Sequence, residues 1–416
     1  MIRYRVCFMC LILLSTLPAA SGDDYAMVIS GGDSYNEYCQ DCYANIICTD
    51  HQIIEGINLG VSSGLFNVGV GNEGLSAAIA CAASPRQESS GAYVFEGFAL
   101  NDLPGNGIMI ADTRAPIILK NVSVDSRGGK LLSSQPVGIG MVNAKDVIIE
   151  NCIALSGSLF RISRSQNIQI KNDTAKNIFL EGISDSIVDN CTADCIMIKG
   201  AISPLYSERP RVLANATVNH GPLRMAESII EISRNCTIKN CNQVKEIDLF
   251  NAEDCAIEGC TMKDVGLWVL NSQNATVRNA TVVNGTLYVD WSKEIVFKNL
   301  SLINSEISMA GSVLEDFSIV FEGCQKDGMP ILYYENQKQL ELKNLTAGQI
   351  WLRGCPEAHI EGCVFEEAYV IDSDGTVIEN SKINGEGINL IFSKNCLLSN
   401  NILSSGEDDR QQHIER

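Results

Sequence analysis

A short pattern recurs fourteen times along this chain, at a mean spacing of about 21 residues. In each copy an apolar and a charged residue precede an Asn or Gly, as in VIIENCIAL at residues 147–155. The alternation has the period of a strand, and Asn and Gly most readily adopt the left-handed conformation of a sharp bend. We expect Asn151, Asn172, Asn190 and Asn215 to stack as an internal ladder at one corner. The bend positions are Asn121, Asn151, Asn172, Asn190, Asn215, Asn240, Gly259, Asn279, Asn299, Gly323, Asn344, Gly362, Asn380 and Asn400.

The copies are predicted to stack as the coils of a solenoid, because their spacing lies in the range of solenoid repeats. A β-sandwich fits less well, since its strands are bounded by hairpin turns, and a leucine-rich repeat needs an LxxLxL frame that these copies lack. We expect an all-β fold, a right-handed parallel β-helix of about 14–17 coils of roughly 21 residues. It is expected to span residues 51–405, with a polar tail at residues 406–416.

Residues 1–22 are typical of a secretory signal peptide. Arg3 and Arg5 precede an apolar stretch at residues 6–17, and small residues follow it. A membrane anchor is the alternative, but about twelve apolar residues fall short of the roughly twenty that a span needs. We therefore expect a secreted chain without direct membrane insertion.

The charge balance limits the partners. The chain has 50 acidic and 31 basic residues, a net charge of −19. Such a charge disfavours nucleic acids and anionic membrane surfaces. Copies of the chain itself, other envelope proteins and glycans remain as expected partners.

The repeat resembles that of the right-handed parallel β-helix superfamily, with the pectate-lyase-like fold, over roughly residues 50–405. This superfamily includes polysaccharide lyases, polygalacturonase-like hydrolases and non-catalytic surface proteins. The resemblance implies that an active site would lie on the outer face of one sheet, where alternation places Glu231, Asp248 and Asp290.

Glu231 and Asp248 are the candidate catalytic pair, since retaining glycosidases use carboxylates about 5 Å apart. The sequence lacks the Asp-pair and Gly-His-Gly signatures of the polygalacturonase-like members and the clustered aspartates of the calcium-dependent lyases. A solvated charge pair is therefore the favoured interpretation, and no catalytic residue is assigned.

The same outward stripe contains the aromatic residues Trp268, Tyr288 and Trp351. They could stack on sugar rings or contact a neighbouring rod or a long loop, because an outward apolar stripe marks an interaction surface. Contact with a partner is the favoured interpretation.

Two of the 17 cysteines lie in the leader, which leaves an odd number in an oxidising compartment. Residues 23–50 are expected to form a cysteine-rich N-terminal cap or assembly segment. Too few ligands cluster there for a metal site, so no metal and no cofactor is expected. Candidates for disulfides or bonds between subunits are Cys39, Cys42, Cys48, Cys81, Cys355 and Cys396.

Cys236 and Cys255 share one repeat position on consecutive coils, and Cys241 and Cys260 share another. Their Cα atoms are expected about 5 Å apart, within the range of a disulfide. Stacked side chains point in parallel, however, so buried thiols are favoured over strained bridges.

Ten N-x-S/T sequons occur, and seven of them arise from the bend residue itself. Bend side chains are expected to bond to neighbouring coils. Asn235, Asn274 and Asn284 lie off that column and are the better glycosylation candidates.

We interpret the chain as a secreted structural protein of the cell envelope that self-assembles through the faces and ends of its β-helix, reinforced by disulfides. An acidic, cysteine-rich β-helix with a leader resembles the surface-layer and tubular-sheath proteins of methanogenic archaea. A polysaccharide lyase or glycoside hydrolase is the first alternative, and a glycan-binding adhesin is the second.

Overall fold

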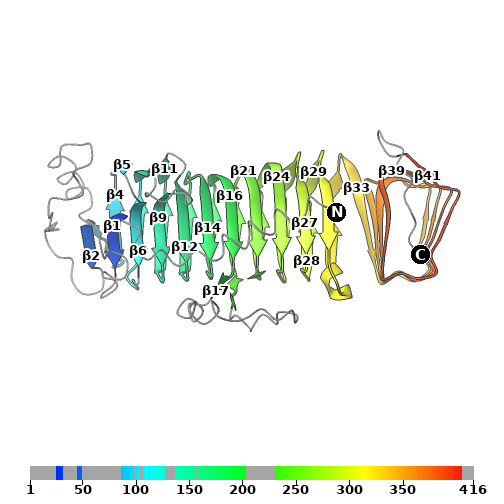
Figure 1. The fold of residues 1–416 in the computed structure, drawn as a ribbon, viewed down its shortest axis with the longest axis horizontal. Helices are drawn as coiled ribbons and strands as arrows, with labels where there is room; N and C mark the ends of the chain where they lie inside the picture. Colours follow the sequence, from blue (N-terminus) through cyan, green and yellow to red (C-terminus); the bar gives the residue numbers. More distant parts are fainter. Residues whose placement is uncertain are drawn as a thin grey trace, which may run out of the picture. The chain divides into compact units, whose positions relative to one another are not determined.

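The computed structural model describes residues 25–30, 45–48, 86–97, 99–103, 106–111, 113–126, 136–155, 158–202 and 230–404 (Figure 1). The chain divides into two compact units, Met1–Glu253 and Asp254–Arg416. Along the chain, the two units contain about 13 β-solenoid turns of about 20 residues each. Within these described ranges the one helical segment is a short 3-10 helix, η2 (Leu314–Phe317). The predicted parallel β-helix is confirmed.

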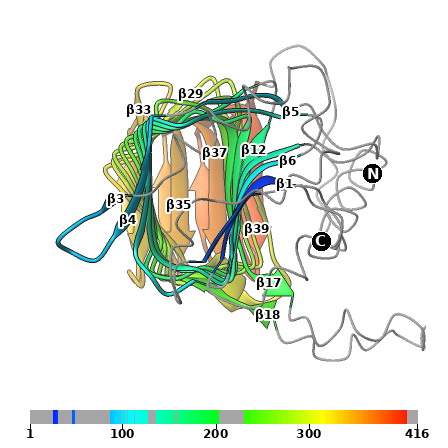
Figure 2. The ribbon, with the colours of Figure 1, turned by 90° about the vertical axis from the view of Figure 1, so that its left-hand side faces the viewer.

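In the first unit, successive coils overlie one another when viewed along the stack (Figure 2). A short-strand sheet contains, in parallel, β4 (Tyr93–Glu96), β7 (Ile117–Lys120), β10 (Lys145–Glu150), β13 (Gln166–Lys171), β15 (Ile187–Asp189) and β20 (Thr237–Lys239), with β3 (Arg86–Gln87) antiparallel beside β4. A long-strand sheet contains β1 (Tyr25–Ser30), β2 (Asn45–Cys48), β6 (Asn106–Ala111), β9 (Val137–Val142), β12 (Leu159–Ser163), β14 (Asn177–Glu181), β16 (Thr192–Lys199) and β21 (Gln243–Phe250). Smaller pairings join β5 (Ala99–Leu103), β8 (Ser123–Ser126) and β11 (Ile153–Leu155), then β17 (Ala201–Ile202) with β18 (Ile230–Glu231), and β19 (Ser233–Arg234) with β22 (Ala252–Glu253).

Each short strand ends at the bend that the repeat predicts. Asn151, Asn172 and Asn190 have φ between 53° and 57°, and the amide of Asn190 donates to the side-chain oxygen of Asn172 at 2.9 Å. These asparagines are exposed, so the expectation of an internal ladder is wrong. The inner side of the corner is occupied by the next residue, the buried Cys152 or Cys191.

Asn215 lies outside the described residues. The coil that carries Asn190 pairs directly with the coil that carries Asn240, with Val188 opposite Ile238. The backbone N–H of Asn190 donates to Lys239 O at 3.0 Å. The bend column therefore passes directly from Asn190 to Asn240, although the side-chain amide of Asn240 donates to Asp189 and not to Asn190.

The second unit contains two successive stacks of coils. The first stack has β23 (Ala256–Glu258), β24 (Thr261–Leu270), β25 (Thr276–Arg278), β26 (Thr281–Val283), β27 (Thr286–Asp290), β28 (Ile295–Lys298), β29 (Ser301–Ile303), β30 (Glu306–Ala310), β31 (Ile319–Glu322) and β32 (Gln325–Lys326). The second stack has β33 (Met329–Glu335), β34 (Glu341–Lys343), β35 (Gln349–Arg353), β36 (His359–Glu361), β37 (Val364–Ile371), β38 (Val377–Glu379), β39 (Lys382–Ile391), β40 (Leu397–Ser399) and β41 (Ile402–Leu403).

A tight hairpin separates the two stacks. β32 pairs antiparallel with β33, with Gln325 opposite Pro330. Asp327 and Gly328 both have positive φ, 49° and 78°, which is the backbone of a two-residue type I′ turn. The chain thus reverses here, and parallel coiling resumes in β33, β35 and β37, which Figure 2 shows as neighbours.

The outer face of β35 is an internal contact of the second unit. Ile350 and Leu352 point into the core of the second stack, and Trp351 points the opposite way. Trp351 is nevertheless only 1% exposed, because its ring lies 4.8 Å from that of Phe321 and 3.9 Å from that of Tyr369. Trp351 thus lies on the outer face, as alternation predicts, but it contacts residues of its own unit rather than a free surface.

Candidate functional site

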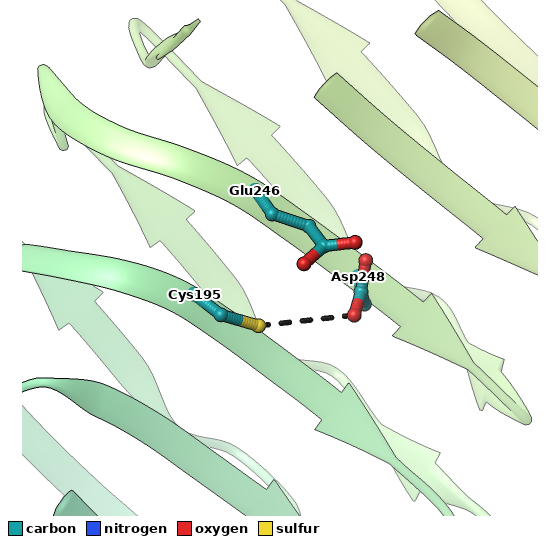
Figure 3. A group of neighbouring side chains, drawn as sticks. All are labelled: Cys195, Glu246 and Asp248. Atoms are coloured by element: carbon teal, nitrogen blue, oxygen red, sulfur yellow. Dashed lines mark hydrogen bonds between the residues drawn. The ribbon is translucent and has the colours of Figure 1, made fainter. Parts of the chain in front are cut away.

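Three ionisable side chains converge on the outer face of the long-strand sheet in the first unit (Figure 3). Cys195 lies on β16, directly opposite Glu246 on the neighbouring β21. Asp248 follows two residues later on the same strand, and the buried Ile247 between them points inward. One sulfur or oxygen atom from each of the three side chains lies within 4.8 Å of the others.

No described basic side chain balances the negative charge that this cluster carries when its carboxyl groups ionise. Cys195 Sγ donates to Asp248 Oδ2 at 3.8 Å, whereas Asp248 Oδ1 is buried and has no hydrogen-bond partner in the described part of the chain. The neighbouring Lys245 pairs with Asp194 at 3.0 Å instead. None of the described basic side chains forms an ion pair with Cys195, Glu246 or Asp248.

All three groups resist ionisation in this setting. Burial, and then the charge of Glu246, hold the pKa of Asp248 well above its usual range. Burial also raises the pKa of Glu246. Burial and the two carboxylates raise the pKa of the Cys195 thiol. Each of the three groups is therefore harder to ionise than in water unless a cation joins them.

The structure does not bring Glu231 and Asp248 together. Glu231 lies on β18, opposite Ala201, and its Oε2 is 3.5 Å from Arg164 Nε. Asp248 lies opposite Met197, four residues before Ala201, which is about 13 Å along a strand. A retaining glycosidase needs its carboxylates about 5 Å apart, so this pair does not have that geometry.

The other catalytic candidate, Asp290, belongs to the second unit. Tyr288 Oη donates to Asp290 Oδ2 at 3.2 Å, and burial raises the pKa of Asp290. Tyr288 lies opposite Trp268 on the adjacent coil, with ring centroids 4.9 Å apart. These two partly exposed rings form a small aromatic patch, without Trp351.

A second acidic group lies on the short strands of the second unit. His359 Nε2 is 2.9 Å from Glu379 Oε1, and Glu361 lies opposite Glu379. Lys343 Nζ is 3.4 Å from Glu361 Oε2. Because Lys343 already compensates its charge, we interpret this group as a surface ion-pair network.

The structure gives two of the disulfide candidates different environments. Cys355 is fully buried, and its Sγ is 3.4 Å from Tyr334 O. It cannot reach another subunit, which corrects the prediction for this residue. Cys396 lies partly exposed before β40, with Sγ 3.7 Å from Ser373 O.

The remaining cysteines divide by location. Cys236 and Cys241 in the first unit, and Cys255 and Cys260 in the second, are buried thiols. Cys39, Cys42 and Cys81 lie outside the described residues, and Cys48 is described only through the backbone of β2.

The three glycosylation candidates are exposed at bends. The side-chain amides of Asn235 and Asn274 donate to carboxylates of adjacent coils, Asp185 and Asp254. Asn284 instead accepts from the amide of another bend residue at 2.9 Å. The side-chain nitrogen Nδ2 of Asn284 donates no hydrogen bond within the described chain, so Asn284 is the most available of the three.

The last coil of the second unit leaves apolar side chains uncovered. Ile383 is 0% exposed, but Leu403, which lies opposite it on β41, is 57% exposed. The neighbouring Ile402 is 64% exposed and Leu397 is 54% exposed. Leu403 therefore continues an inward apolar column into the final described coil, whereas Ile402 and Leu397 lie opposite Lys382 and Val377, on the outer faces of their strands.

Sequence reasoning missed Cys195 and Glu246. The spacing of Glu246 and Asp248 places both on one face of a strand, and this signal was available. Cys195 joins them only through the pairing of β16 with β21, and residues 203–229 hide that pairing in the sequence.

No protein-family model and no curated protein matches the sequence. Two structures of PfbA, a surface adhesin of Streptococcus pneumoniae, are 12% and 13% identical to this chain, with TM-scores of 0.41 and 0.42. Both matches cover 80% of this chain, and they cover 94% and 87% of the adhesin chains. An exopolygalacturonase of Thermotoga maritima is 9% identical, with a TM-score of 0.28 over 75% of this chain and 82% of its own. At these values the comparisons assign no activity to this chain.

In the described ranges, no segment forms a helix with the length and apolarity that a membrane crossing requires.

Proposed function

We propose that this chain is a non-catalytic structural protein of the cell surface that assembles end to end with copies of itself, as a subunit of a sheath or surface layer. The proposal rests on the uncovered last coil. Leu397, Ile402 and Leu403 expose more than half of their surface there. Complete burial of one such side chain contributes about 1.5–3 kcal/mol.

The first stack of the second unit also has a coil end, and that end is covered. In its last coil, Phe317 and Phe321 are only 5% and 4% exposed. Tyr333, Trp351 and Phe392 of the second stack lie against them. The final coil has no comparable aromatic layer, so its exposed apolar edge is a feature of that end alone among the described coils of this unit.

A second copy of the chain is the occupant that fits this end. β40 and β41 are the last described strands of their sheets, and each presents one edge of backbone N–H and C=O groups. Another parallel coil matches their strand spacing of about 4.8 Å and covers the apolar side chains at once. The coils of this chain provide such strands.

The separation of Glu231 from Asp248 supports the non-catalytic part of the proposal. The signal-like segment at residues 1–22 supports export. The resemblance to archaeal sheath proteins in composition and architecture supports the choice of a surface assembly over a single adhesin.

Sedimentation velocity and negative-stain electron microscopy test the proposal. We expect the wild-type chain without its leader to form concentration-dependent end-to-end oligomers. Ile402→Lys with Leu403→Lys should give monomers, because two ammonium groups cannot be buried in an apolar contact. Ile303→Lys is the matched control, since Ile303 is 45% exposed on β29, away from the last coil. A wild-type chain that stays monomeric, or a terminal variant that assembles like the control, would contradict end-to-end assembly.

A further inference from the structure

We propose that Cys195, Glu246 and Asp248 bind one thiophilic divalent cation, for which Zn²⁺ is the best fit. This inference does not depend on the proposed function. The donor set is one thiol and two carboxylates, and Zn²⁺ accepts both sulfur and oxygen ligands in proteins. Ca²⁺ and Mg²⁺ prefer oxygen ligands alone, so the cysteine favours a softer ion.

The distances suit a small ion. Zn–S and Zn–O bonds of about 2.3 Å and 2.0 Å at a tetrahedral angle place the sulfur and oxygen about 3.5 Å apart. Cys195 Sγ and Asp248 Oδ2 are 3.8 Å apart, and no pair of the three donor atoms exceeds 4.8 Å. Small side-chain rotations therefore bring all three donors to bonding distance without a change in the backbone.

The second observation is the orphaned oxygen of Asp248. A buried carboxylate oxygen without a partner is costly, and Asp248 Oδ1 is such an atom among the described residues. Figure 3 shows that one oxygen of Asp248 faces Cys195, while the other lies beside the carboxylate of Glu246. Two carboxylates that face each other cannot both stay ionised without compensation, so the pair holds either a proton or a cation.

The surroundings leave that charge to an external cation. Lys245 and Lys176 both pair with Asp194 and not with the cluster. The acidic group around His359 differs in this respect, since Lys343 pairs with it. Of the two acidic groups, only the cluster in the first unit lacks a described basic side chain as its counter-ion, so a metal ion fits that cluster better.

Rigid elements hold the three ligands. Glu246 and Asp248 are fixed on one strand, and Cys195 is held opposite Glu246 by the pairing of β16 with β21. Three protein ligands leave one tetrahedral position for water. The site thus resembles an open zinc site in ligand number, although the inference concerns binding and not catalysis.

The experiment uses the full secreted chain under reducing conditions, loaded with Zn²⁺ or Co²⁺ and desalted. We expect one metal equivalent that is lost in Cys195→Ser and Asp248→Asn, together with the sulfur-to-cobalt charge-transfer absorption. Dissociation constants should rise at least about tenfold in these variants. Cys396→Ser is the matched control, because Cys396 lies in the second unit, and it should keep both signals.

Glu246→Gln, a shape-conserving change on the same strand, should also weaken binding, and far-ultraviolet circular dichroism verifies that each variant is folded. The site is refuted if the wild-type chain retains no metal. It is equally refuted if Cys195→Ser and Asp248→Asn retain as much metal as the wild type, or if Cys396→Ser loses as much as Cys195→Ser.

Discussion

The indole ring of Trp351 stacks on the phenol ring of Tyr369, with centroids 3.9 Å apart and planes inclined by only 11°. Both residues lie on the outer face of their sheet in the second unit, and Tyr369 Oη donates to Ile307 O in the last coil of the first stack at 3.3 Å. Outward side chains that an isolated second stack would expose therefore cover the last coil of the first stack. Of the three aromatic residues of the predicted stripe, Trp351 contacts the chain itself, and a partner for Trp268 and Tyr288 stays a prediction.

Trp351→Ala should destabilise the second unit by about 3–5 kcal/mol, because a fully buried indole is removed and a cavity remains. Urea unfolding followed by circular dichroism measures the loss. Trp291→Ala is the control of the same residue type, since Trp291 is 49% exposed, and it should cost about 1 kcal/mol or less. Equal losses in the two variants would show that the Trp351 layer does not stabilise the coil end.

The repeat predicted the coils because each short strand repeats one local rule, an apolar residue facing in and a left-handed bend after it. The rule fails where one copy stands alone. Asn215 carries the pattern but lies outside the described residues, and the coil of Asn190 pairs directly with the coil of Asn240, which a five-residue pattern does not predict. The hairpin at Asp327 and Gly328 carries a recognised turn signal, but the following repeats conceal that the chain starts a new stack there.

Candidate sites were harder to predict than coils. Asp248 was correctly placed on the outer face, yet its neighbours depend on strand register. Glu231 was assigned to the same stripe from local alternation, and its antiparallel pairing with Ala201 removes it from that stripe. Contacts between coils depend on the whole length of the chain between them, which local patterns do not encode.

The bend column should respond to backbone strain. Asn190 has φ of 53°, so Asn190→Ala should cost about 1–2 kcal/mol, because Ala lacks the short polar side chain with which Asn tolerates a left-handed conformation. Asn190→Gly escapes this penalty and loses only the side-chain hydrogen bond to Asn172. Thermal unfolding of both variants checks the order. A glycine variant less stable than the alanine variant would contradict the backbone explanation, because both variants lack the side-chain hydrogen bond to Asn172.

Stability should also depend on the buried carboxyl of Glu367. Burial raises its pKa to about 7, compared with about 4.3 in an unfolded chain. Between about pH 4 and pH 7 the folded chain holds a proton that the unfolded chain has lost, so stability falls as pH rises through this window. Above it the penalty is complete, on the order of 3 kcal/mol.

Glu367→Gln should remove this fall, so its stability relative to the wild type should rise from pH 4 to pH 7 and then level off. In the wild type the side-chain amides of Gln349 and Asn389 each donate to one oxygen of Glu367. In the variant, the new amide oxygen accepts from one of them, and the other rotates its amide so that its oxygen accepts from the new N–H group. Glu306→Gln, at an exposed position, is the control and should show no such trend. A difference between variant and wild type that is independent of pH would rule out titration of Glu367 as the cause.

Covalent reinforcement of the assembly should depend on Cys396. This thiol is partly exposed in the last coil, close in sequence to the uncovered Leu397, so end-to-end contact brings it near a second copy. With oxidised glutathione as the oxidant, two thiols of adjacent subunits become one disulfide and the glutathione is reduced. Non-reducing gels should then show a dimer band that disappears in Cys396→Ser and on adding reductant. Cys355→Ser is the matched control, because the fully buried Cys355 cannot bridge subunits. If the dimer band persists in Cys396→Ser, the intersubunit disulfide must involve other cysteines, such as those of the N-terminal segment. If the band is lost in the Cys355 variant, the reactivity of the thiols does not follow their exposure.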